Sequence, residues 1–250
     1  MSVSAWLNRP GTLVARIWRP MYEGGYQVFK GCVMFVLTPV YRIRRVGPPP
    51  RLPAGGAVLC PNHTSYLDPA FVQLALRRRA TFIMTNDFYA LPAARWFFKL
   101  VGAVPIGRGR LGRRGMRRAI ALVKRGHTIV LFPEGRLSRD GHLGHAQRGV
   151  GRIARRTGAP VIPVGIAGAF HAWSHGRTRP GHANVRVAYG PAMYWQDGER
   201  RHRRRDEQAF ADRVISGIAQ TKAWVQRAAP VPGDIRAEAQ VLQPTESSGR

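Results

Sequence analysis

Acidic side chains are scarce in this sequence. Its 250 residues include 13 aspartates and glutamates against 40 lysines and arginines, which gives a formal net charge of +27. This imbalance favours a polyanionic partner, such as nucleic acid, an anionic membrane surface or phosphorylated substrates. Lysine is also rare, so a genome that prefers arginine codons is an alternative explanation for part of the excess.

Cysteine occurs only twice, as Cys32 and Cys60. Two cysteines do not make a disulfide framework, and no CxxC spacing indicates a metal site. We therefore expect no metal and a reducing, cytosolic-side location. A secretory signal is not expected either, because charged residues interrupt the first apolar stretch.

Long apolar runs are missing as well. The uncharged run at residues 31–41 has 11 residues, whereas a membrane-spanning helix needs about 20. Two short helical pieces separated by Gly24-Gly25, with aromatic residues and flanking arginines, instead predict an amphipathic, membrane-associating helical segment over residues 1–48. The alternative is a helical pair that packs on the core of the domain.

The remaining chain shows the periodicity of an α/β protein. A linker rich in proline and glycine at 47–56 predicts a boundary, with one domain over residues 49–227 and a flexible tail over 228–250. Apolar runs at 57–60, 81–84, 128–132, 161–166 and 185–190 alternate with helix candidates at 69–79, 88–100, 113–125, 147–157 and 207–227. This alternation predicts a single α/β domain with a mixed, largely parallel sheet flanked by helices. In such folds, sites gather at the loops that leave the strand ends.

Residues 62–69, NHTSYLDP, form the loop between the first of these strands and a helix. Asp68 is a natural N-cap, with Pro69 at the first helical position. That interpretation leaves His63 unexplained. Histidine can take a proton from an alcohol when a carboxylate fixes its tautomer, so His63 and Asp68 are candidates for a general base and its partner.

Three later segments also carry polar residues in loops. GAVPIGRGR at 102–110 places Arg108 in a glycine-rich turn, where a guanidinium group can bind phosphate oxygens. LFPEGRLSRDG at 131–141 follows a strand and contains Glu134, Arg136 and Ser138. GAPVIPVGI at 158–166 is an apolar strand in which Pro163 indicates an edge or a bend.

The four segments, in this order, resemble the four blocks of the glycerolipid acyltransferases, the 1-acyl-sn-glycerol-3-phosphate acyltransferase family. The resemblance implies acyl transfer from acyl-CoA or acyl carrier protein, used as co-substrates without a further cofactor, to a lysophospholipid hydroxyl. It makes His63 the base and Asp68 its partner, and it implies a role in substrate binding for Asn62, Arg108, Glu134, Gly135, Arg136, Ser138 and Pro163. In two places the chain departs from the family pattern, with Arg136 where threonine is usual and Gly107 where an acidic residue is usual.

The expected setting is the cytoplasmic face of the cell membrane, with the protein bound peripherally or monotopically to an anionic surface. Alternatives for the acceptor are glycerol 3-phosphate or another lysophospholipid, and a thioesterase would use the same base to activate water. Cys60 and Ser65 are alternative nucleophiles. A nucleic-acid-binding protein is disfavoured, because no zinc-finger, RNA-binding or basic-zipper pattern is present and the arginines are spread along the chain.

Overall fold

The fold is described from a computed structural model. It describes residues 24–25, 28, 31–33, 35, 37–50, 52–53, 55–76, 78–85, 103–106, 109–196 and 203–228. The helix candidate at 88–100, the tail beyond residue 228 and residues 1–23 of the N-terminal segment therefore lie outside the described residues.

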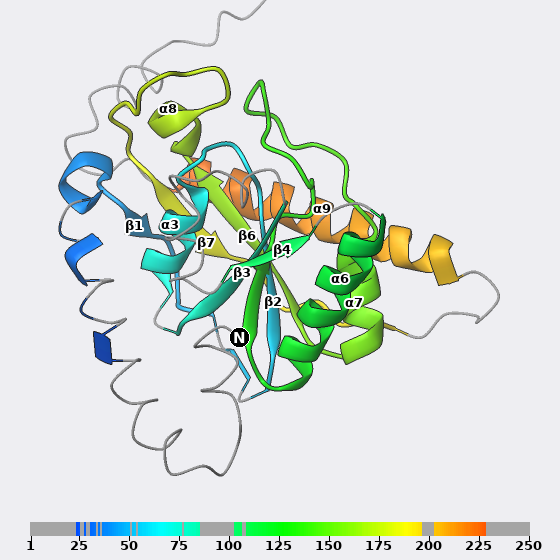
Figure 1. Cartoon of the computed structure of the whole chain (residues 1–250). Helices are drawn as coiled ribbons and strands as arrows, with labels where there is room; N and C mark the ends of the chain where they lie inside the picture. The colour runs from blue at the N-terminus through cyan, green and yellow to red at the C-terminus, as the bar shows by residue number, and fades with distance from the viewer. Residues whose placement is uncertain are drawn as a thin grey trace, which may run out of the picture.

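One seven-stranded sheet organises the described chain, in the order β1-β7-β6-β2-β5-β3-β4. Every neighbouring pair is parallel except β6 and β7, which are antiparallel (Figure 1). The predicted mixed, largely parallel sheet is thus confirmed. The strands are β1 (Arg44–Arg45), β2 (Ala57–Pro61), β3 (Ala80–Thr85), β4 (Val104–Ile106), β5 (Thr128–Leu131), β6 (Val161–Ala167) and β7 (Arg186–Tyr189).

Helices cover both faces of this sheet. Alternate residues of β2 show the division, because Leu59 belongs to one apolar core cluster and Val58 and Cys60 belong to the other. The first cluster includes buried residues of α3 (Asp68–Ala75) and α8 (Ala169–Trp173). The second includes buried residues of α6 (Gly109–Lys124), α7 (Gly149–Thr157) and α9 (Arg203–Arg227). The carboxyl ends of β2, β5 and β6 consequently meet at one edge, where their loops are free to form a site.

The N-terminal residues that the structure describes end in a helix, with residues 37–41 helical. Leu37 and Tyr41 pack on the first core cluster, as the alternative interpretation predicts, and Tyr41 contacts Phe71 with 5.3 Å between ring centroids. Phe35 and Val28, in contrast, are 82% and 69% exposed. Strand β1, which lies within the predicted segment 1–48, pairs with β7 and forms an edge of the sheet. Among the described residues, no helix is both long and apolar enough to cross a membrane.

Pro163 was predicted to mark an edge or a bend of the sheet. The edge alternative is wrong, because β6 lies inside the sheet between β7 and β2. Two residues separate Val161 from Val164, whereas three separate their partners Met193 and Tyr189. This extra residue is a bulge at the point where β7 ends. The Pro163 carbonyl accepts a hydrogen bond from the Gly190 amide at 2.8 Å, and the missing amide hydrogen of Pro163 falls beside the bulge, where no regular ladder bond is required.

Gly151 sets the close crossing of α7 and α9. A Cβ at this position would overlap the backbone carbonyl of Glu207, which a helix cannot move without repacking. We expect Gly151→Ala to lower the free energy of unfolding by about 3 kcal/mol, measured by denaturant titration. Gly149→Ala in the same helix is the control. Its Cβ would meet only the flexible end of Met116, so its stability should equal or exceed that of the wild type, and equal losses in both variants would contradict this account.

Candidate active site

Asn62 fixes the loop that carries His63 to the neighbouring strand. Its side-chain amide donates to the Ile166 carbonyl at 3.0 Å and accepts from the Ile166 amide at 2.7 Å. Asn62 is fully buried, so both bonds form away from water. The residue predicted to bind substrate thus joins the end of β2 to β6, and a contact with substrate stays a prediction.

His63 and Asp68 form a direct pair, with 3.0 Å between His63 Nδ1 and Asp68 Oδ2. The same carboxylate oxygen accepts the backbone amides of Thr64 and Ser65, each at 2.7 Å. Asp68 is fully buried, whereas the His63 side chain is 16% exposed and stacks on Phe132 with 4.0 Å between ring centroids. Because Nδ1 faces the carboxylate, Nε2 is the ring nitrogen left for a substrate proton.

The N-cap interpretation of Asp68 is wrong. The cap of α3 is Leu67, and it makes no side-chain cap hydrogen bond. Asp68 is the first residue of the helix, and its carboxylate turns back into the preceding loop, toward His63 and the two amides. The amides hold the carboxylate in place, so the geometry that begins the helix also orients the imidazole.

The segment after β5 holds the His63 backbone on both sides. Glu134 accepts the His63 amide at 2.9 Å through one carboxylate oxygen and the Gly144 amide at 2.8 Å through the other. The Ser138 amide donates to the His63 carbonyl at 2.8 Å. Glu134 is therefore a positioning residue for the proposed base. Binding of an acceptor head group by Glu134 stays a prediction, since both of its oxygens already have backbone donors.

We call the hydrogen bonds of Glu134 and Ser138 with the His63 backbone the Glu134 clamp. The other predicted residues of this loop lie beside it. The Ser138 hydroxyl donates within its own turn and accepts the Gly141 amide at 3.0 Å. Gly135 adopts a left-handed φ of 68°, and both Gly135 and Arg136 are exposed beside the site. Arg136 is thus open to a ligand, whereas a substrate role for Ser138 and Gly135 stays a prediction.

Two predicted residues are not brought to His63 by the described structure. Arg108 lies outside the described residues. Pro163 contacts α9, where a Cβ on Gly217 would meet the proline ring at 2.8 Å. The suggested role of Pro163 in a wall of the substrate site therefore stays a prediction.

The alternative nucleophiles are poorly placed. Cys60 is fully buried within β2, and burial raises the pKa of its thiol far above the usual range, which disfavours the reactive thiolate. Ser65 is also fully buried, and its hydroxyl donates to the Trp173 carbonyl at 3.2 Å. The described residues contain no group of three or more histidine, cysteine or acidic side chains that could hold a metal ion. The His63–Asp68 pair has the arrangement of a general base and its partner.

Glu134 gives a test of the clamp. Burial raises its pKa, although the amides of Gly144 and His63 partly oppose this by stabilising the carboxylate. Glu134→Gln keeps the shape but turns an amide NH2 group toward a backbone donor. We expect the free energy of unfolding to fall by about 1–3 kcal/mol and kcat to fall by about 10-fold to 100-fold, because the His63 backbone shifts.

The contribution of Glu134 to the free energy of unfolding should depend on pH in a definite direction. A carboxyl group with a raised folded-state pKa binds protons more tightly in the folded protein than in the unfolded chain. Its contribution to stability is therefore lost as the pH rises from the ordinary carboxyl pKa through the raised one. The wild type should lose stability relative to Glu134→Gln across that window.

Glu207→Gln is the control for Glu134→Gln, because it changes another buried carboxylate, which is paired with Arg155. It should lower stability without lowering kcat of the folded protein.

Comparison with known proteins places this site in a family. A sequence model of the Acyltransferase family matches residues 42–167. The chain is 33% identical over 136 residues to a chloroplastic 1-acyl-sn-glycerol-3-phosphate acyltransferase of Brassica napus, covering 53% of this chain and 39% of that protein. A chloroplastic enzyme of the same name from Arabidopsis thaliana is 33% identical over 134 residues, covering 52% and 37%. The chain thus spans about two fifths of the length of these relatives.

A solved structure shows the same fold. The 1-acyl-sn-glycerophosphate acyltransferase PlsC of Thermotoga maritima matches with a TM-score of 0.52 at 22% sequence identity, covering 78% of this chain and 88% of that one. The family match begins at Arg42 and ends at Ala167, so it contains the His63–Asp68 pair and the Glu134 clamp. By its sequence, the chain belongs to the Acyltransferase family.

Proposed function

We propose that this protein transfers a fatty acyl group from a thioester, acyl-CoA or acyl carrier protein, to the free hydroxyl of 1-acyl-sn-glycerol 3-phosphate. The observation that carries the proposal is the His63–Asp68 pair, with its 3.0 Å contact and its partly exposed imidazole. The names of the relatives from Brassica napus and Arabidopsis thaliana support the choice of acceptor. The product is phosphatidate, a precursor for phospholipid synthesis.

The mechanism needs one base and no enzyme nucleophile, because a thioester is already activated. Nε2 of His63 takes the proton of the acceptor hydroxyl as its oxygen attacks the thioester carbonyl carbon. The buried Asp68 carboxylate stabilises the imidazolium that forms. When the tetrahedral intermediate collapses, the carbon–sulfur bond breaks, and the departing thiolate takes the proton from the imidazolium.

Phosphate recognition is assigned to two arginines, Arg136 and Arg108. Arg136 is exposed in the loop that clamps His63, and Arg108 occupies the matching position of the family's second block. Guanidinium groups bind phosphate oxygens with two parallel hydrogen bonds. In this proposal, they hold the acceptor phosphate while its hydroxyl faces Nε2.

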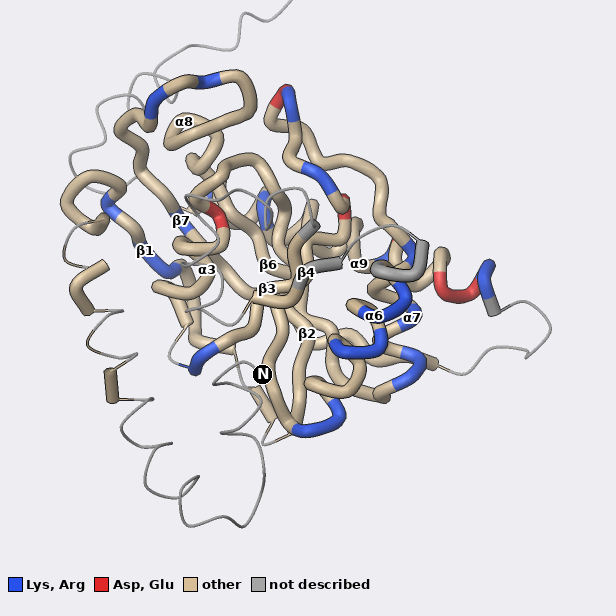
Figure 2. Tube along the Cα trace, viewed as in Figure 1, with Lys and Arg blue, Asp and Glu red and all other residues tan. Residues whose placement is uncertain are grey.

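The proposed setting is the cytoplasmic face of the cell membrane. The exposed Phe35 and Val28 near the N-terminal helix support contact with lipid, and basic residues on several elements support attraction to an anionic surface (Figure 2). Nucleic-acid binding would explain the same positive charge but would not explain the His63–Asp68 pair.

A product assay tests this proposal. Purified protein is incubated with labelled acyl-CoA or labelled acyl carrier protein, alone or with lysophosphatidate, glycerol 3-phosphate or another lysophospholipid. Labelled phosphatidate that depends on lysophosphatidate is the expected main product. Free fatty acid as the main product at saturating lysophosphatidate would instead identify a thioesterase.

A further inference from the structure

Two stretches without acidic residues meet at one pocket. Residues 24–67 and 141–196 contain no aspartate or glutamate. The fold brings parts of both to a pocket of about 1020 Å³ at the carboxyl end of β6. The thirteen lining residues that belong to the described part of the chain include no acidic side chain. They include five basic or titratable ones, which define the basic pocket: Arg42, His171, Arg177, His182 and Arg186.

Arg42 lines this pocket, and backbone hydrogen bonds hold the chain around it. It is the single non-glycine residue with positive φ in the described chain, at 40°, a conformation that a side chain with a Cβ disfavours. Its amide donates to the Thr38 carbonyl at 2.7 Å, which ends the N-terminal helix. The neighbouring backbone bonds to Val185, just before β7, through the Tyr41 carbonyl and the Arg44 amide. The backbone that carries this guanidinium is therefore fixed by both the helix and the sheet.

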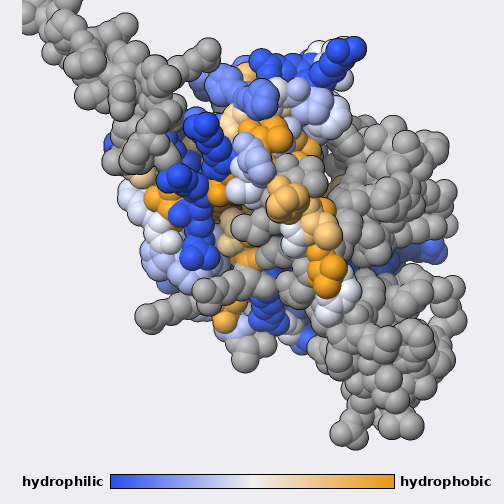
Figure 3. Space-filling view, turned by 90° about the vertical axis from the view of Figure 1, so that its left-hand side faces the viewer, coloured by the Kyte–Doolittle hydropathy of each residue, from blue (hydrophilic) through white to orange (hydrophobic). Residues whose placement is uncertain are grey.

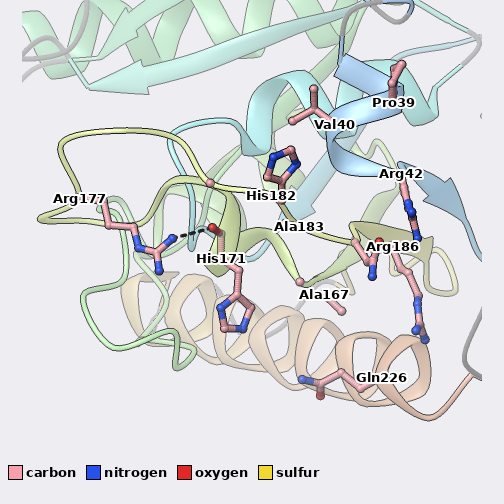
Figure 4. Close-up of a pocket in the computed structure, with 13 residues that line it drawn as sticks. Pro39, Val40, Arg42, Ala167, His171, Arg177, His182, Ala183, Arg186 and Gln226 are labelled. Carbon is pink, nitrogen blue, oxygen red and sulfur yellow. Dashed lines mark hydrogen bonds between the residues drawn. The ribbon is translucent and has the colours of Figure 1, made fainter. Parts of the chain in front are cut away.

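The other two arginines are anchored as well. Arg177 donates to the His171 carbonyl at 2.8 Å, and Arg186 donates to the Ala228 carbonyl at 2.8 Å. In Figure 4, Arg42 and Arg186 lie on one side of the pocket and Arg177 lies on the other, with His171 and His182 between them. A guanidinium has five N–H donors, so a bond to a carbonyl fixes its position and still allows it to bind an anion. Anchored guanidinium groups suit a phosphate group, whose oxygens accept their paired N–H donors.

The pocket lies apart from the His63 loop. The Trp173 carbonyl at the end of α8 accepts bonds from the Ser65 hydroxyl and the Tyr66 amide, so this end of α8 packs on the catalytic loop. His171, two residues earlier in α8, instead lines the basic pocket. The two sites therefore share a helix but not their lining residues.

An apolar rim adjoins these cations. Pro39 and Val40 of the N-terminal helix line the pocket, and Val40 is 37% exposed. Phe35, in the preceding part of the same segment, is 82% exposed. Strongly hydrophilic and hydrophobic residues lie next to each other on this side of the molecule (Figure 3). A ligand that joins a phosphate to apolar chains matches both parts.

We propose that the basic pocket binds the headgroup phosphate of an anionic membrane phospholipid, while its acyl chains contact the N-terminal helix. This lipid is a membrane ligand, separate from the acceptor at His63. The inference rests on the proposed membrane association and does not require acyl transfer.

A vesicle-binding assay with matched variants tests the proposal. The probe is phosphatidylcholine vesicles with and without phosphatidylglycerol, a lipid that is neither acceptor nor product of the proposed reaction. The pocket variant is Arg42→Asn with Arg177→Gln, since asparagine tolerates the left-handed conformation of residue 42. The control variant, Arg113→Gln with Arg117→Gln, removes the same charge from an exposed face of α6.

We expect the apparent Kd for phosphatidylglycerol vesicles to rise at least about tenfold in the pocket variant and by less than about twofold in the control. Thermal unfolding of both variants at the wild-type temperature confirms that they fold. Equal weakening in the two variants would overturn the pocket assignment while leaving membrane association in place. Failure of the wild type to bind phosphatidylglycerol vesicles would overturn both.

Two soluble probes separate the lipid from other sources of phosphate. Coenzyme A and inorganic phosphate are added in turn, and thermal stabilisation is measured. Stabilisation of the wild type but not of the pocket variant, together with unchanged vesicle binding, would overturn the lipid assignment in favour of a soluble phosphate. Stabilisation that is equal in both proteins supports the lipid as the ligand of the basic pocket.

Discussion

Replacement of His63 with alanine should lower kcat for acyl transfer by about 10²-fold to 10⁴-fold, because general base catalysis contributes that much to typical enzymes. The loops around the site should keep their conformation, since the Glu134 and Ser138 bonds to residue 63 involve its backbone and not its ring. The measurement is the initial rate of phosphatidate formation at saturating lysophosphatidate. Added imidazole should restore part of the rate, because the lost ring leaves a partly exposed space above Phe132.

His145→Ala is the matched control for this change, because His145 is an exposed histidine outside the His63–Asp68 pair. Its rate should equal that of the wild type. Vesicle binding and thermal unfolding should be unchanged in both variants, apart from a small loss of stability at residue 63. A wild-type rate in His63→Ala would show that this imidazole is not the base.

Asp68→Asn should have an effect of similar size on the rate. The asparagine oxygen can still accept the Thr64 and Ser65 amides, so the loop should remain folded. The negative charge beside His63 Nδ1 is lost, and the imidazolium formed during transfer loses its stabilisation. We expect kcat to fall by about 10²-fold to 10⁴-fold, with KM for lysophosphatidate nearly unchanged. The free energy of unfolding should fall by about 1–3 kcal/mol, because bonds to a charged acceptor become bonds to a neutral one.

Asp140→Asn serves as the control for the loss of one carboxylate. The Asp140 carboxylate accepts the His142 amide at 3.0 Å and the Ser138 hydroxyl at 3.0 Å, and it is not the carboxylate that contacts the His63 ring. Its effect on kcat should therefore be small. If Asp140→Asn and Asp68→Asn lowered kcat equally, the special role of Asp68 in orienting His63 would be contradicted.

Much of the fold could be predicted from local sequence patterns. Each apolar run assigned to a strand is a strand, because burial on both faces of a parallel sheet leaves a continuous apolar signature. The short elements β1 and α8 were missed, since two and five residues carry too little periodicity to be recognised. The sequence alone indicates only an edge or a bend at Pro163, because the bulge beside it depends on the partner strand, which the sequence of β6 does not encode.

The candidate site was predictable only in part. The order of the four blocks identified His63 and Asp68. The preference of aspartate for the N-cap position, however, wrongly predicted that Asp68 caps the helix. The contacts that position the base connect residues far apart in the sequence: Asn62 with Ile166 and Glu134 with His63. Such pairs follow from the neighbouring positions of β2, β5 and β6, so a sequence pattern can mark their residues but not reveal that they bond to each other.

The central claim is that His63 activates the acceptor hydroxyl for direct attack on the thioester. Single-turnover release of thiol from labelled acyl-CoA, measured with and without lysophosphatidate, tests it most directly. The account predicts that thiol release requires lysophosphatidate, yields one phosphatidate for each thiol and leaves no label on the protein. A burst of one thiol per enzyme without acceptor, with the acyl label bound to the protein, would contradict it and would identify an enzyme nucleophile.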